Sequence, residues 1–206
     1  MHIIKFYLLL NQSIMNFKLN VVLAALLFAG TVSAQHVNIG VKGGLNLYNI
    51  NADNGSTYDT KPGLNLGLLG HIHLAKQLGL QPEIVYSSQG AKFGTNNSKL
   101  NLDYINVPVL FQYMFDNGFR LEAGPQVGFL VSAKSKLNGT STDVKANFKS
   151  VDFGLGAGIG YIHPPSGFGV DARYNLGLSN INEMGTVKSH NRGVQLGVFY
   201  LFNHKN

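Results

Sequence analysis

Residues 151–161 have the sequence V-D-F-G-L-G-A-G-I-G-Y, which alternates between two kinds of side chain. Every second residue from Val151 to Tyr161 is apolar, and the residues between them are Asp152 and four glycines. A period of two is typical of a β-strand, whose successive side chains point to opposite faces. A soluble strand would present polar side chains to water instead of glycine. The pattern favours a membrane strand, with its apolar face toward lipid and its glycine face toward a crowded barrel lumen.

The same alternation recurs in seven other segments. The expected fold class is therefore all-β, an eight-stranded antiparallel transmembrane β-barrel in up-and-down meander order. In the fourth segment the apolar parity changes, which predicts a bulge at Tyr104 and Ile105. Phe199 interrupts the polar inner row of the last segment, with no explanation from the sequence. The expected strands are residues 36–48, 63–74, 78–89, 100–115, 119–133, 151–161, 168–178 and 192–202.

The connections between these strands also alternate. Those after odd-numbered strands are polar and about ten residues or longer, whereas those after even-numbered strands are short. Short turns at one end and long loops at the other are typical of outer-membrane barrels, with the short turns in the periplasm. The long connections are 49–61, 90–99, 134–150 and 179–191, and the short ones lie around 76–77, 116–118 and 163–167.

Aromatic residues gather at both ends of the expected strands, as they do at the two interfaces of a membrane. Those near the opposite, long-loop end are Tyr86, Tyr104, Phe129 and Phe153. The aromatic girdle expected at the short-turn end consists of Tyr113, Phe115, Phe119, Tyr161, Phe168, Tyr200 and Phe202.

A soluble barrel of the lipocalin kind is the competing interpretation, because alternation alone does not tell inside from outside. Three observations favour the membrane barrel. The polar face lacks a dense coat of Lys and Glu, the aromatic residues share the parity of the aliphatic ones, and the connection lengths alternate.

The first 34 residues are predicted to be a signal peptide. A short basic region at residues 15–18 precedes an apolar run at 21–30 and a V-S-A cleavage motif ending at Ala34. Residues 1–14 are interpreted as a misassigned start upstream of Met15. The remainder, residues 35–206, is one barrel domain. It contains no cysteine, so neither disulfides nor thiolate chemistry are available. The full sequence has a net charge of +6, of which Lys5 and Lys18 lie in the signal peptide, and export argues against a nucleic-acid partner.

Four short motifs resemble the outer-membrane β-barrel domain common in Bacteroidota, in particular its PorT-like group. They are G-V-K-G-G-L-N at residues 40–46, Q-P-E at 81–83, Y-I-N-V-P at 104–108 and E-A-G-P at 122–125. The resemblance implies a small barrel in the outer membrane and assigns no activity; a few members resemble components associated with type IX secretion. This chain has Asn106 where the group often has Glu.

Charged residues on the inner parity are expected to pair inside the barrel. An eight-stranded barrel is just wide enough for side chains to fill it, and unpaired charges there would be costly. We expect a plugged, structural lumen; a narrow solute channel is the alternative. The predicted lumen network consists of Lys42, Glu83, Arg120, Glu122, Asp152, Asp171 and Arg173, with Arg192 near the rim.

Catalytic, metal and cofactor sites are not expected. The glycines of 154–160 are spaced strictly by two and no helix follows, unlike a dinucleotide-binding loop. His71 and His73 share a strand face, a spacing that can bring two imidazoles to one metal, but the sequence places no third ligand, with His190 and His36 the candidates. We interpret the pair as polar lumen residues near the periplasmic end. A lipid-modifying enzyme would need a rim site, for which the last long loop offers only Glu183, Ser189 and His190.

Lysines are frequent in the expected outer loops. They suit contact with phosphates of the outer-leaflet glycolipid, or simply a solvated loop face. The expected partners are therefore outer-membrane lipid or glycolipid and a protein bound through loops or turns. These lysines are Lys61, Lys92, Lys99, Lys134, Lys136, Lys145, Lys149 and Lys188.

Overall fold

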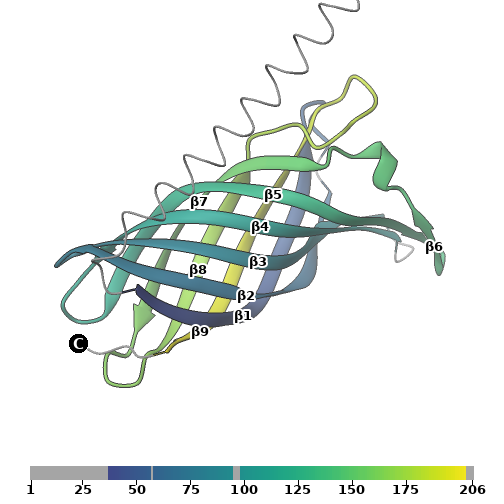
Figure 1. The fold of residues 1–206 in the computed structure, drawn as a ribbon. Helices are drawn as coiled ribbons and strands as arrows, with labels where there is room; N and C mark the ends of the chain where they lie inside the picture. Colours follow the sequence, from purple (N-terminus) through teal and green to yellow (C-terminus); the bar gives the residue numbers. More distant parts are fainter. Residues whose placement is uncertain (1–36, 57, 95–97, 203–206) are drawn as a thin grey trace, which may run out of the picture. The chain divides into compact units, whose positions relative to one another are not determined.

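A computed structural model describes residues 37–56, 58–94 and 98–202 as one closed antiparallel barrel (Figure 1). The strands follow the order β4-β3-β2-β1-β9-β8-β7-β5, and pairing of β4 with β5 closes the ring of eight. The expected eight-stranded barrel is confirmed. The elements are β1 (Val37–Ala52), β2 (Asp59–Ala75), β3 (Leu78–Phe93), β4 (Ser98–Met114), β5 (Phe119–Leu137), β6 (Thr140–Asp143), the 3₁₀ helix η1 (Lys145–Asn147), β7 (Val151–Ile162), β8 (Phe168–Gly177) and β9 (Ser189–Leu201).

The two faces of the barrel wall have opposite polarity. Outward-facing aliphatic side chains are exposed, for example Leu66 at 68% and Val198 at 62%, whereas inward-facing Asn46 and Gln195 are buried. An apolar outer surface and a polar interior are the arrangement that lipid requires. Among the described residues, no helix is long and apolar enough to cross a membrane. The predicted signal peptide, residues 1–34, lies outside the described residues.

Several strands run further into the predicted loops than the sequence indicated. The expected loops 49–61 and 90–99 shrink to short connections between β1 and β2 and between β3 and β4. The expected loop 134–150 contains the end of β5, the short strand β6 and η1. Strands β3, β4 and β5 thus continue beyond the closed ring toward β6 (Figure 1), and we call this four-stranded part the extension. At these strand ends the inner face is apolar, with Ile50 and Ala91, and the outer face is polar, with Lys92, which reverses the polarity used to recognise the strands.

The bulge lies in β5, and its predicted place in β4 is wrong. Asp103 pairs with Ser132 and Tyr104 pairs with Leu130, so the extra residue is Val131. Strand β4 keeps one parity throughout, and its Leu100 and Leu102 are buried inside the barrel. The sequence misled because this part of the inner face is apolar, so polarity alone indicated a change of face.

Glycines face two inward-pointing aromatic rings. Gly169 of β8 pairs with Phe199 of β9, and Gly193 of β9 pairs with Tyr48 of β1. A Cβ at either glycine would collide with the ring of its partner. The glycine on the neighbouring strand therefore explains how Phe199 fits among polar lumen residues.

Candidate functional site

The centre of the lumen holds a buried network of ion pairs. Arg173 of β8 lies 2.9 Å from Glu83 of β3 and 2.8 Å from Glu122 of β5. Lys42 of β1 lies 2.7 Å from Asp171 and 3.6 Å from Glu83. All five side chains are almost fully excluded from solvent. The network joins strands on opposite sides of the barrel and fills the space between them.

Amide side chains complete the hydrogen bonding of the carboxylates. Gln81 Nε2 donates to Glu83 Oε1 at 2.7 Å, and Gln112 Nε2 donates to Glu122 Oε2 at 3.0 Å. Gln112 also donates to Gln81 Oε1 at 2.9 Å. Buried charges are tolerated when they are both paired and hydrogen-bonded, which holds for Glu83, Glu122 and Arg173. Lys42 and Asp171 balance each other as an ion pair.

Two residues of the predicted network lie apart from its ion pairs. Buried Arg120 makes no ion pair within the described residues; its guanidinium lies 5.3 Å from the centroid of the Phe199 ring. Asp152 lies toward the loop end, where it accepts hydrogen bonds from Ser179 Oγ at 2.6 Å and Asn191 Nδ2 at 3.0 Å. We predicted that all seven charged residues form one structural network in the lumen, and that role stays a prediction.

The glycine face of β7 provides room for the arginines. A Cβ at Gly156 would lie 3.1 Å from Cδ of Arg173, and one at Gly160 would lie 3.1 Å from Cγ of Arg120. On β9, a Cβ at Gly197 would come within 2.9 Å of Asp171 Oδ1. These glycines leave the volume that the long charged side chains occupy.

A layer of uncharged polar side chains follows on the loop side of the ions. Asn65 Nδ2 donates to Asn46 Oδ1 at 2.9 Å, and Asn46 Nδ2 donates to Ser87 Oγ at 2.9 Å. Asn175 Nδ2 donates to the Tyr48 hydroxyl at 2.8 Å. The polar lumen is therefore cross-linked by hydrogen bonds between strands as well as by ion pairs.

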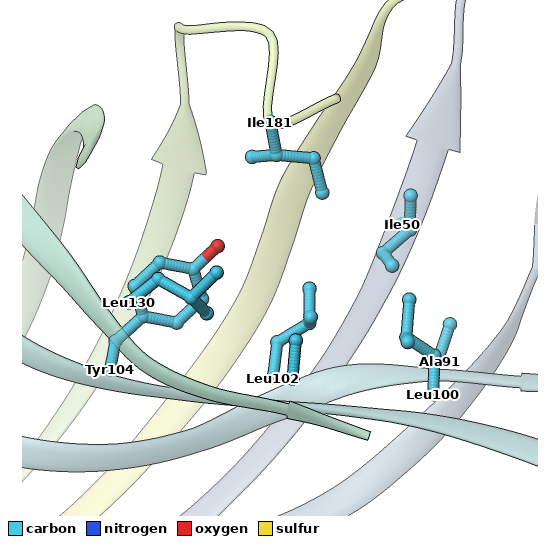
Figure 2. Close-up of a cluster of buried hydrophobic side chains, with 8 residues drawn as sticks. Ile50, Ala91, Leu100, Leu102, Tyr104, Leu130 and Ile181 are labelled. Atoms are coloured by element: carbon cyan, nitrogen blue, oxygen red, sulfur yellow. The ribbon is translucent and has the colours of Figure 1, made fainter. Parts of the chain in front are cut away.

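The loop end of the lumen is closed by an apolar cluster that the sequence analysis missed (Figure 2). Ile181 reaches in from the β8–β9 connection and packs over side chains of the barrel wall. Tyr104, predicted for the outer girdle, is 1% exposed and belongs to this cluster, so that prediction is wrong. Because Asn106 and Gln112 share the parity of Leu102, an unbroken register through β4 would have revealed the cluster. Its members are Ile50, Ala91, Leu100, Leu102, Tyr104, Leu130, Ala133 and Ile181.

The short-turn end carries a second apolar cluster and a pocket. Leu69, Ile162, Phe199 and Leu201 are buried together. A pocket of about 160 Å³ lies beside them, and buried Arg120 and Ile162 form part of its lining. Together with the loop-end cluster, this packing encloses the polar lumen between two apolar layers.

The predicted girdle residues lie at this same end. Their rings contact each other in pairs: Tyr113 with Phe115, Phe119 with Tyr161, and Tyr200 with both Phe168 and Phe202. Five of the seven are exposed, and Tyr161 and Tyr200 are half-buried. Their role at a membrane interface stays a prediction.

The described histidines lie at two different ends of the barrel. His71 and His73 rings pack 4.5 Å apart beside the pocket, whereas His190 lies 3.5 Å from Asp53 at the opposite end. Within the described residues, no group of three His, Cys, Asp or Glu could hold a metal ion. Within the part of the chain that the structure describes, no hydrogen bond joins the side chains of Ser189, His190 and Glu183. Ser189 Oγ instead accepts a hydrogen bond from Asn182 Nδ2.

Four lysines share the outer face of the extension. Lys92 of β3 pairs with Lys99 of β4, and Lys99 pairs with Lys136 of β5. Lys134 follows on the same face of β5, and we call these four residues the lysine face. Lys61 differs from the prediction: it is 5% exposed, and its Nζ donates to the carbonyl of Gln89 at 3.0 Å.

Comparisons with known proteins agree with this geometry. The family model described as "Outer membrane protein beta-barrel domain" matches residues 33–183. The structure is similar to Neisserial surface protein A, with 15% identity, a TM-score of 0.56 and coverage of 81% of this chain and 99% of that chain. It is also similar to Ail, the attachment invasion locus protein of Yersinia pestis, with 18% identity, a TM-score of 0.52 and coverage of 80% and 98%. No curated protein matches the sequence.

Proposed function

Because the chain belongs to the outer membrane protein beta-barrel domain family, we propose that it is a closed barrel with a structural or partner-binding role. Its location is the bacterial outer membrane. The observation that carries the proposal is the filling of the lumen, where ion pairs and hydrogen-bonded amides lie between two apolar clusters.

This filling argues against a channel. An ion crossing the barrel would have to separate the pairs of Arg173 with Glu83 and Glu122, which are excluded from water. It would also have to pass the apolar cluster around Leu102, whose mainly hydrocarbon side chains are poor substitutes for its hydration shell. Both barriers are costly, because they uncover buried charges or place a charge among apolar side chains.

Conductance in planar lipid bilayers tests the proposal. The full chain is refolded, its folded state is verified by its shift on a gel, and single-channel current is recorded. We expect a folded barrel without discrete current steps. Steps that change when Glu122 is replaced by Gln would show a conducting lumen and contradict the proposal.

We also propose that the chain is not an enzyme. Ser189 and His190 are consecutive on β9, so their side chains point to opposite faces of the strand. The hydrogen-bond partners of Ser189 and the neighbour of His190 likewise offer no path for proton transfer between them. Replacing His190 by Ala should leave the lipid composition of the host membrane unchanged in mass spectra, whereas a lost lipid modification would contradict this.

Two finer assignments rest on the sequence. Membership of the PorT-like group of Bacteroidota is supported by the motifs at residues 40–46, 81–83, 104–108 and 122–125. Export is proposed to remove residues 1–34 as a signal peptide. Mass determination of the protein isolated from outer membranes tests the cleavage, with Gln35 expected as the first residue.

A further inference from the structure

The bulge in β5 determines what the two faces of the extension carry. Before Val131 in the chain, the inward residues of β5 are even-numbered, such as Glu122 and Leu130. After Val131 the parity changes, so that Ala133 is buried and Lys134 is exposed. Without the extra residue, Lys134 and Lys136 would point into the apolar cluster. Bulges commonly re-aim side chains near functional sites. Here the bulge places the lysines outside.

The resulting lysine arrangement is unfavourable for the free protein. Lys99 stands directly opposite both Lys92 and Lys136 on its two neighbouring strands. Like charges that are directly opposite in a sheet destabilise it. Asp59 is opposite Lys92 and Asp143 is opposite Lys134, but Lys136 is opposite uncharged Ser141. Among the described residues, no ion pair within 4.0 Å involves these lysines.

The height of the lysine face above the membrane limits which anionic ligand it can reach. Lys92 and Lys99 lie six residues beyond Tyr86 and Ile105, the cross-strand pair at the loop end of the apolar outer face. Six residues at about 3.3 Å each, on a strand tilted by roughly 40°, place the lysine face about 15 Å further out along the membrane normal than that pair. A phospholipid headgroup layer is only about 5–8 Å thick, and charge interactions are screened within about 8 Å. The lysine face therefore lies further from the membrane than the phosphates of phospholipid headgroups.

We propose that the lysine face binds the phosphorylated saccharide of the glycolipid in the outer leaflet of the same membrane. This inference rests on the proposed partner-binding role and on the short turns lying in the periplasm. The row of ammonium groups is complementary to several phosphates on one saccharide chain, and such a chain extends above the headgroup layer. Binding would also neutralise the repulsion between Lys99 and Lys136.

The test measures binding by the full-length barrel in phosphatidylcholine nanodiscs. The probe is the labelled, phosphorylated core oligosaccharide released from a bacterial lipopolysaccharide by deacylation. Replacing Lys99 and Lys136 by Ser should weaken binding about 25-fold, because each lysine near anionic groups contributes roughly fivefold in affinity. The matched control replaces Lys149 and Lys188 by Ser, which removes the same charge from exposed connections, and should stay within about twofold of the original chain.

Three outcomes would overturn the assignment. The first is that the oligosaccharide binds equally well after its phosphates are removed. The second is that the control variant weakens binding as much as the Lys99 and Lys136 variant does. The third is that phosphatidylglycerol vesicles compete for the probe as well as the unlabelled oligosaccharide does. A second readout separates binding from a structural role: the Lys99 and Lys136 replacements should raise or preserve the melting temperature, since they remove repulsion. A conducting barrel that still binds the probe in this pattern would contradict only the closed-lumen proposal.

Discussion

Arg173 forms a two-pronged ion pair with Glu83, although 90 residues separate them. Nη1 donates to Oε2 at 3.1 Å, and Nη2 donates to Oε1 at 2.9 Å. Strands β8 and β3 are not neighbours in the sheet, so the pair crosses the lumen. It joins opposite walls that the hydrogen bonds between adjacent strands do not connect.

Replacing Arg173 by Met should destabilise the barrel strongly. Glu83 and Glu122 would lose a buried cation, and breaking a buried pair in this way costs about 3–5 kcal/mol. Urea unfolding in lipid vesicles, followed by gel shift, measures the loss. A variant that also replaces Glu83 and Glu122 by Gln is the control and should recover most of the stability. A loss below about 1 kcal/mol for the single variant would show that the pair is not structural.

Replacing Gly158 by Ala should destabilise the barrel by about 1–3 kcal/mol through overpacking. The new Cβ would lie 2.5 Å from the carbonyl oxygen of Ala172 and 2.9 Å from the Cα of Arg173, and backbone atoms cannot easily move away. Gly43 is the matched control, because its nearest neighbour would be a Leu66 methyl group at 3.6 Å. Equal unfolding free energies for the two variants would contradict the close packing of β7 against β8.

Replacing Ile181 by Ala should loosen the β8–β9 connection and leave the barrel folded. Ile181 is the only residue of that connection in the described apolar cluster, so its truncation removes the main apolar contact there. Trypsin should then cleave after Lys188 several times faster, because local opening becomes less costly. Met184, which is 63% exposed, is the control, and its replacement by Ala should leave the cleavage rate unchanged. Equal rates for the two variants would mean that the cluster does not hold the connection.

Deleting Val131 should disrupt the extension. Removal of one residue shifts the upper half of β5 to the opposite parity, which turns Lys134 inward and Ala133 outward. We expect faster trypsin cleavage after Lys134 and Lys136 and weaker binding of the phosphorylated probe. Val131 replaced by Ala keeps the length and is the control. Unchanged cleavage in the deletion variant would show that the bulge does not determine the orientation of the lysines.

The sequence by itself determined the class of fold and its polarity. The alternation around Phe153, Leu155 and Ile159 indicates an apolar outer face, and these three residues are exposed in the structure. It also placed Lys42, Glu83 and Arg173 on the inner face. A period of two is a local property of the chain, so eight strands and their faces are visible without knowledge of their partners.

Only the tertiary structure decided which inward residues meet, and where the faces change. The pairing of Arg173 with Glu83 depends on strands four places apart in the sheet, and the bulge at Val131 depends on the register between β4 and β5. The apolar cluster around Leu102 was missed for a related reason. Polarity marks a face only where one side meets lipid and the other meets polar groups; at the loop end the interior is itself apolar, so burial there follows from the closed ring of strands.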